Sequence, residues 1–217
     1  MIRGAIFDVD GTLLDSMHIW EELGTRYLRT LGREPVEDLA ETFRTFTLEQ
    51  SAAYFRSHYG VTRTVPEIVR DMEGLLRNFY FEEAQLRPGV EELLVRLEEA
   101  HIPMVLATAT DRVLVEGALE RCGILHHFSG VVTCAEAGSK TQPRIYEEAR
   151  RRLGTPRADT WVFEDACHGA ATAARAGFPV LGVRDPSEPD QEGLRALSAV
   201  YLENFRHPEA FWAEALK

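Results

Sequence analysis

Two kinds of hydrophobic pattern divide the chain. From about residue 16 to residue 83, apolar residues recur at the three- and four-residue spacing of amphipathic helices. Glycine and proline interrupt this pattern at residues 32–35 and 60–66. Strand-like alternation is missing from this stretch, so we expect it to form a block of about four helices.

A different pattern begins after Arg87-Pro88-Gly89, where short apolar runs alternate with helical patterns. The runs lie at residues 103–107, 130–133, 160–163, 179–183 and, more weakly, 199–202, and a last helix is expected near 208–215. A similar run at residues 4–9 opens the chain. Such alternation is typical of a parallel sheet with helices on both faces. We predict an α/β core, residues 1–15 and 84–217, with a helical subdomain, residues 16–83, inserted after the first strand.

Composition limits the binding partners and the cellular compartment that we expect for this protein. The formal net charge of −11 provides no basic face, so we expect no nucleic-acid partner. Apolar runs stay well short of the ~18 residues that span a bilayer, so we expect no membrane partner. The first acidic residue, Asp8, comes too early for a signal peptide, and the three cysteines have no metal-binding or disulfide spacing. These features indicate a cytoplasmic protein.

Polar residues follow the ends of four predicted strands. Ligands of open α/β sheets bind at the carboxyl ends of the strands, so these residues are expected to form one site. They are Asp8 and Asp10 after the first strand, Thr108 and Thr110 after the second, Lys140 in the loop after the third, and Glu164 and Asp165 after the fourth.

The carboxylates of this group predict a cation. Asp8 and Asp10 are two residues apart, so both side chains can leave the strand on the same side. Close carboxylates repel one another, and Glu164 and Asp165 add further negative charge. Magnesium prefers oxygen ligands and usually combines one or two carboxylates with water and substrate phosphate. We therefore predict Mg²⁺ as the cofactor.

The same residues carry a family resemblance. The stretch Asp8-Val9-Asp10-Gly11-Thr12-Leu13-Leu14-Asp15-Ser16 resembles the first signature of the haloacid dehalogenase-like hydrolase superfamily. Thr108 matches the second signature, Lys140 the third, and Phe163-Glu164-Asp165 the fourth, in the order and spacing of the family. The helical insert resembles the cap of the β-phosphoglucomutase-like subfamily, whose core is a Rossmann-like parallel sheet.

The resemblance implies a role for each residue. Asp8 would attack phosphorus and form an aspartyl phosphate, and Asp10 would protonate the leaving oxygen and then activate water. Thr108 and Lys140 would complete the catalytic set. The substrate-binding residues would be Asp8, Asp10, Gly11, Thr108, Ala109 and Lys140. The metal ligands would be Asp8, the backbone carbonyl of Asp10, and Asp165, with Glu164 nearby or acting through water.

The expected function is therefore a Mg²⁺-dependent phosphatase. Its substrate would be a small phosphorylated metabolite such as a sugar phosphate, and the protein is expected to be a monomer. The alternative is a sugar phosphomutase, whose cap carries a Gly-x-x-Arg loop. Here Thr45 and Leu48 stand where the glycine and arginine would be, which disfavours a mutase, although Arg44 could serve instead.

Other functional classes agree less well with the sequence. Phosphonate-hydrolysing relatives need a cap lysine, which is missing from residues 16–83, and haloacid dehalogenases lack a counterpart of Asp10. A signalling receiver domain has no helical insert after its first strand, and a silent binding protein would not need the full acidic set. The third signature departs from the usual Lys-Pro-x-Pro-Asp, reading Lys140-Thr141-Gln142-Pro143-Arg144. His126-His127 shows no partner at metal-ligand spacing, so a loop is expected there.

Overall fold

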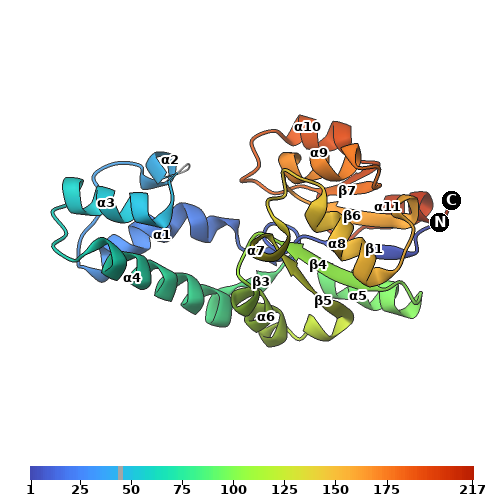
Figure 1. The fold of residues 1–217 in the computed structure, drawn as a ribbon, viewed down its shortest axis with the longest axis horizontal. Coiled ribbons are helices and arrows are strands. Elements are labelled where there is room, and N and C mark those ends of the chain that lie inside the picture. Colours follow the sequence, from blue (N-terminus) through green and yellow to red (C-terminus); the bar gives the residue numbers. More distant parts are fainter. Residues whose placement is uncertain (44–45) are drawn as a thin grey trace. The chain divides into compact units, whose positions relative to one another are not determined.

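The chain divides into two compact units. The computed structural model describes residues 1–43 and 46–217. One unit, here called the core unit, comprises Met1–Asp15 and Gln85–Lys217, and the other, the insert unit, comprises Ser16–Ala84 (Figure 1). Ala84, which the sequence placed with the core, belongs to the insert unit.

A six-stranded parallel sheet forms the centre of the core unit, which confirms the predicted α/β class. The strands follow the order β5-β4-β1-β6-β7-β8. Their bounds are β1 Gly4–Phe7, β4 Met104–Thr108, β5 Phe128–Thr133, β6 Thr160–Glu164, β7 Val180–Val183 and β8 Val200–Leu202.

Strand β1 lies in the middle of the sheet, and every one of its side chains is apolar or absent. All four of its residues are buried, as expected for a parallel strand covered on both faces. The Phe7 ring stacks on Phe163 of the neighbouring strand β6, with centroids 4.0 Å apart. Gly4 is needed for close packing, since a β-carbon there would lie 2.8 Å from the Thr155 hydroxyl. This packing fixes the strand whose end carries Asp8.

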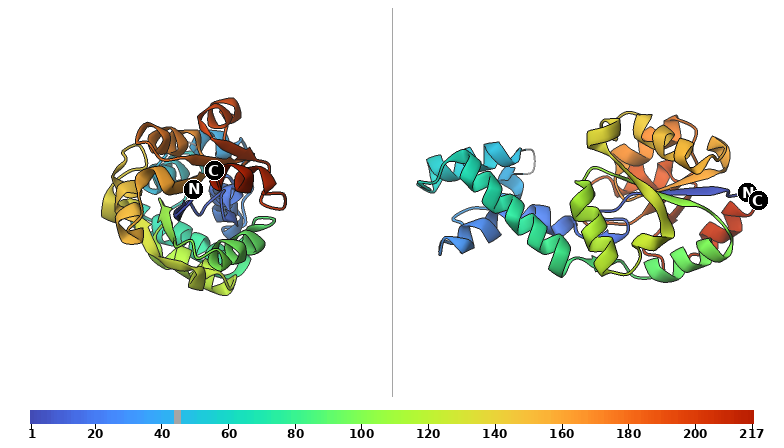
Figure 2. Two further views of the ribbon diagram at one scale, coloured as in Figure 1. Left: turned by 90° about the vertical axis from the view of Figure 1, so that its right-hand side faces the viewer. Right: turned by 60° about the horizontal axis from the view of Figure 1, so that its bottom comes forward.

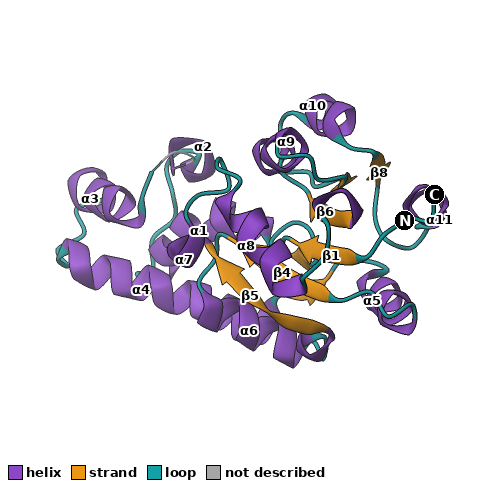
Figure 3. Cartoon of the chain, turned by 45° about the vertical axis from the view of Figure 1, so that its right-hand side comes forward, coloured by secondary structure: helices purple, strands orange, loops and turns teal. Residues whose placement is uncertain are grey.

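Helices surround the sheet (Figures 2 and 3). They are α5 Val90–Glu99, α6 Arg112–Arg121, α7 Cys134–Ala137, α8 Arg144–Leu153, α9 Cys167–Arg175, α10 Gln191–Leu197 and α11 Glu209–Ala215, with 3₁₀ turns at Leu125–His127 and Arg157–Asp159. Helices α7 and α10 were not predicted from the sequence. Local caps make them possible: Thr133 and Glu136 form a capping box at α7, and Asp190 accepts from the Gly193 amide at α10.

The insert unit is helical, as predicted. Its elements are α1 Met17–Thr30, α2 Leu39–Phe43, α3 Leu48–His58, α4 Val65–Asn78 and a π-helical turn at Phe79–Glu83. Capping boxes begin α3 at Thr47 and α4 at Thr64. The break expected near residues 60–66 separates α3 from α4, and Pro66 itself lies in the first turn of α4, where a missing N–H costs nothing. Tyr27 of α1 packs against Phe55 of α3, with ring centroids 5.0 Å apart.

Two short strands that the sequence did not predict pair where the core chain is interrupted. Strand β2, Leu14–Asp15, pairs antiparallel with β3, Gln85–Leu86. At the other end of the sheet, the Ile2 amide donates to the Ala215 carbonyl at 2.7 Å, so the two ends of the chain lie side by side (Figure 2). Within the described residues, every helix is too short or too polar to cross a membrane.

Candidate active site

The end of β1 places Asp8 beside the end of β6. The Asp8 amide donates to the Phe163 carbonyl at 3.0 Å, which extends the parallel pairing of β1 and β6 by one residue. The next two residues of β6 and its loop are Glu164 and Asp165. A turn at Gly11, with φ of 77°, then directs the chain back, and the Leu13 and Leu14 amides both donate to the Val9 carbonyl at 2.9 Å. The backbone alone therefore brings the carboxylates of the two strands together.

Lys140 joins two of these carboxylates. Its Nζ forms an ion pair with Asp8 and donates to Glu164 Oε1 at 2.7 Å. All three side chains are less than a tenth exposed. Burial alone would lower the pKa of Lys140, but the Asp8 and Glu164 carboxylates outweigh burial and raise it. The ammonium group is therefore held in its charged form between two acids.

Nearby positive charge balances the buried carboxyl groups of Asp8 and Asp165 only in part. Burial raises the pKa of Asp8 to about 7, with a further contribution from the charge of Glu164, although Lys140 opposes both. Burial followed by the charge of Asp8 raises the pKa of Asp165 well above its usual range. Thr12 Oγ1 donates to Asp165 Oδ1 at 3.0 Å and fixes that carboxyl group. One lysine is too little positive charge for these buried carboxylates.

Asp10 has a different environment. Its carboxylate is half-buried, and Oδ2 accepts from Thr110 Oγ1 at 2.7 Å. The Thr110 amide in turn donates to Oγ1 of Thr108, a residue that is fully buried at the end of β4. Ala109 is exposed between these two threonines. Strand β4 thus supplies both a hydroxyl that orients Asp10 and a small exposed residue at the sheet edge.

The oxygen atoms near Asp8 fit a divalent cation. Among the described residues, Asp8, Glu164 and Asp165 form one of two groups whose potential ligand atoms all lie within 4.8 Å of one another. Glu164 Oε1 accepts from both Lys140 and Tyr146, whereas Oε2 is buried without a hydrogen-bond partner. An orphaned, buried carboxylate oxygen in an all-oxygen cluster is what a Mg²⁺ ligand would present.

The predicted ligand set included Asp10, and its carboxylate is not in this group. Its side chain instead accepts from Thr110, which is compatible with the backbone carbonyl role that the resemblance implies. The structure thus brings the side chains of Asp8, Lys140, Glu164 and Asp165 together, places Thr108 at the end of β4, and places Asp10, Gly11 and Ala109 in the neighbouring loops.

The sequence did not predict two residues that hold the Glu164 side chain in place. Tyr146 of α8 is 1% exposed, and its Oη donates to Glu164 Oε1 at 2.8 Å. Gly169 of α9 lies against the same side chain, because a β-carbon there would stand 2.6 Å from Glu164 Oε1. A tyrosine on a buried helix face carries no signal of a polar partner, so only the fold could assign this contact.

A buried ion pair supports the Gly11 turn. Arg87 donates through Nη1 to the Gly11 carbonyl at 2.7 Å and to Asp185 Oδ2 at 2.6 Å, and through Nη2 to the Arg184 carbonyl. Both Arg87 and Asp185 are less than a tenth exposed. The pair therefore ties the loop after β1 to the loop after β7.

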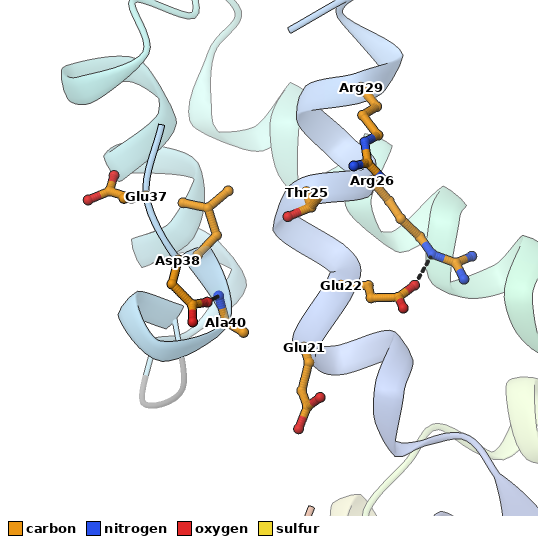
Figure 4. A pocket seen from close by; sticks show the side chains of 9 residues that line it. Glu21, Glu22, Thr25, Arg26, Arg29, Glu37, Asp38 and Ala40 are labelled. Atoms are coloured by element: carbon orange, nitrogen blue, oxygen red, sulfur yellow. Dashed lines mark hydrogen bonds and ion pairs between the residues drawn. The ribbon is translucent and has the colours of Figure 1, made fainter. Parts of the chain in front are cut away.

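The insert unit has a pocket of its own. Figure 4 shows charged side chains around it, from α1 on one side and from residues 37–40 on the other. The lining residues are Glu21, Glu22, Thr25, Arg26, Arg29, Glu37, Asp38, Leu39 and Ala40. Arg26 is paired with Glu22 at 3.0 Å. Arg44 and Thr45, which bear on the mutase alternative, lie outside the described residues, and Leu48 begins α3.

The expectation for His126-His127 was wrong. These residues form a 3₁₀ turn rather than a loop, and Glu98 lies close enough to form the second group of potential metal ligands.

Comparisons with known proteins place the chain in a family. The profile of the haloacid dehalogenase-like hydrolase family matches residues 5–183, so the chain belongs to this family. A fruit-fly (Drosophila melanogaster) protein named "Probable pseudouridine-5'-phosphatase" is 29% identical over 97% of this chain and 94% of its own. Validoxylamine A 7'-phosphate phosphatase of Streptomyces hygroscopicus subsp. limoneus is 28% identical over 84% and 86%.

The fold is similar to that of a solved structure from another organism. A crystal structure titled "putative beta-phosphoglucomutase" from Thermotoga maritima superposes with a TM-score of 0.80 and 26% identity, covering 93% of this chain and 94% of that one. The resemblance to the β-phosphoglucomutase-like subfamily is thereby confirmed.

Proposed function

We propose that this chain is a phosphatase that hydrolyses a small phosphorylated metabolite, with Asp8 as the nucleophile and Mg²⁺ as the cofactor. The observation that carries the proposal is the buried contact of Asp8 with Lys140, beside Glu164 and Asp165. Membership of the hydrolase family and two relatives named as phosphatases support it. Both names refer to a small phosphorylated compound, and a sugar phosphate or a similar ester is the proposed substrate class.

The residues suggest a reaction in two steps. In the first, an Asp8 carboxylate oxygen attacks phosphorus, the bond to the ester oxygen breaks, and Asp10 gives that oxygen its proton. In the second, Asp10 takes a proton from water, the water oxygen attacks the aspartyl phosphate, and phosphate leaves Asp8 free again. Splitting one displacement into two is the general advantage of a covalent intermediate.

Charge compensation is the main task of the other groups. Lys140 would hold phosphoryl oxygens while it remains paired with Asp8, and the hydroxyl of Thr108 lies at the neighbouring strand end. Asp8, Glu164 and Asp165 would hold Mg²⁺, which offsets the negative charge of the phosphoryl group. Thr110 would keep Asp10 aimed by its 2.7 Å hydrogen bond. The protein is expected to act as a monomer.

Phosphate release is the direct test. Purified protein with MgCl₂ is incubated with sugar phosphates, nucleoside monophosphates and an aryl phosphate, and inorganic phosphate is measured. We expect turnover that requires Mg²⁺, stops with EDTA and is lost in Asp8→Asn, whose amide cannot act as the nucleophile. The folded state of the variant is checked by circular dichroism.

The same incubations distinguish a phosphatase from a sugar phosphomutase. A sugar phosphomutase would interconvert two isomeric sugar phosphates while releasing little phosphate, which is visible by ³¹P NMR. Isomer formation that exceeds phosphate release on every active substrate would reject the phosphatase. Equal release by Asp8→Asn and by the unchanged protein would reject Asp8 as the nucleophile.

A further inference from the structure

We propose that Glu98, His126 and His127 form a second metal site, separate from the acidic cluster and suited to Zn²⁺ or a similar transition-metal ion. The potential ligand atoms of these three side chains all lie within 4.8 Å of one another. Two imidazoles and a carboxylate are a common donor set for such ions, whereas Mg²⁺ prefers oxygen alone. The two sites would therefore select different cations.

The environment of His127 points to a ligand. Its side chain is only 5% exposed, and its Nδ1 lies 2.8 Å from Glu98 Oε2. That nitrogen is nevertheless buried without a hydrogen bond of acceptable geometry. Two ligand atoms that each lie about 2.1 Å from one ion stand about 3.0–3.4 Å apart, for bond angles between about 90° and 109°, without pointing at each other. The observed pair is slightly closer than this and makes no hydrogen bond of acceptable geometry, so a small outward shift of the Glu98 carboxylate would admit an ion.

Two different elements supply the ligands. Glu98 lies in the last turn of α5, and the histidines end the 3₁₀ turn Leu125–His127 that precedes β5. The two imidazole rings are neighbours, with centroids 4.0 Å apart and planes inclined by 36°. The carboxyl end of a helix favours a nearby cation through its exposed carbonyl dipoles. A bound ion would thus connect α5 to the start of β5.

The site is remote from the catalytic cluster. Glu98 comes shortly before β4 begins at Met104, and His127 comes immediately before β5 begins at Phe128. Both therefore lie at the amino ends of parallel strands, whereas Asp8, Thr108 and Glu164 lie at the carboxyl ends. Five residues of strand at ~3.3 Å each put about 16 Å between the two edges. The second ion would stabilise the core unit rather than touch the substrate.

The test is a titration of the full chain with ZnCl₂ by calorimetry, in buffer that contains MgCl₂. The Asp165→Asn variant removes a carboxylate of the catalytic cluster and weakens metal binding there, so that the Glu98 and His126 substitutions decide whether the remaining Zn²⁺ lies at the second site. Glu98→Gln and His126→Ala change exposed side chains and should fold, whereas replacing buried His127 risks the structure. His207→Ala, an exposed histidine between β8 and α11, is the matched control.

We expect one Zn²⁺ per chain to bind to Asp165→Asn, and the same affinity when His207→Ala is added. Adding Glu98→Gln or His126→Ala should weaken binding by at least about tenfold. Zn²⁺ should also raise the melting temperature of Asp165→Asn, and this rise should vanish with His126→Ala. Unchanged Zn²⁺ affinity in both ligand variants, or no Zn²⁺ binding to Asp165→Asn at all, would overturn the site.

Discussion

Tyr146 provides a sharp test of how the acidic cluster is held. Glu164 Oε1 accepts from two donors, Lys140 Nζ at 2.7 Å and Tyr146 Oη at 2.8 Å, and Oε2 accepts from none. Because Glu164 is fully buried, no water can replace a lost donor. Tyr146→Phe removes one hydroxyl and leaves the ring, so it alters the position of Glu164 without opening a cavity.

The size of the effect follows from the contacts that remain. A hydrogen bond to a charged group contributes about 1.5–3 kcal/mol. Lys140 and the close approach of Gly169 still restrain the carboxylate, so the lower end of that range applies. We therefore expect the Mg²⁺ concentration for half-maximal activity to rise roughly tenfold, as is typical when a partner of a metal ligand is lost. At saturating Mg²⁺, kcat should change less than about threefold, because the Tyr146 hydroxyl donates to Glu164 and not to Asp8 or Asp10.

The assay is phosphate release against MgCl₂ concentration, with melting temperatures measured alongside. Tyr201→Phe is the matched control, since its Oη also donates to a side chain, Gln191 Oε1 at 2.6 Å, but away from the acids. An unchanged Mg²⁺ requirement in Tyr146→Phe would refute the positioning role. A Mg²⁺ requirement that rises equally in both variants would show that the loss of stability, and not Glu164, is responsible.

Three further predictions follow from the core unit. Thr110→Val should lower kcat about tenfold with little change in KM, because Asp10 loses its orienting hydrogen bond; a KM effect alone would contradict this. Arg87→Met should cost about 3–5 kcal/mol in urea unfolding, because Asp185 becomes a buried unpaired charge, and a cost below about 1 kcal/mol would show that water reaches Asp185. In EDTA, stability should fall as pH rises, because the pKa of Asp8 is raised from 3.8 to about 7 and the folded state binds the extra proton. The stabilisation from this proton on Asp8 is fully present below about pH 3.8 and is lost as the pH rises through about 7, and Asp8→Asn should lack it.

Strand ends were the part of the site that sequence could predict. The apolar run before Asp8 and the run before Glu164 each mark a buried strand, and parallel strands bring their carboxyl ends to one edge. The pairing of β1 with β6 was not needed for this inference. The apolar runs were sufficient because both strands are continuous and fully buried, so the first polar residue after each run marks the end of the strand.

Contacts between distant side chains could not be predicted in this way. Tyr146 lies on a helix face that looks purely apolar in sequence, and Glu98 is 28 or more residues before the histidines that it meets. Such contacts depend on how helices pack across the sheet, which one sequence does not specify. The short β2–β3 pair was missed for a different reason, since two residues per strand carry no periodicity.

The charge of the cluster connects the proposed cofactor with the proposed chemistry. Asp8, Asp10, Glu164 and Asp165 bring four carboxyl groups near a single ammonium group, Lys140. If all were ionised, an incoming phosphate would meet a net negative charge in a buried site, where repulsion is weakly screened. The raised pKa values of Asp8 and Asp165 mean that, without metal, protons reduce this charge. Mg²⁺ would bind the same oxygens and release those protons, leaving Asp8 ionised and able to attack. Protons and Mg²⁺ would therefore compete for one set of oxygens, and only bound Mg²⁺ would leave Asp8 as a reactive nucleophile.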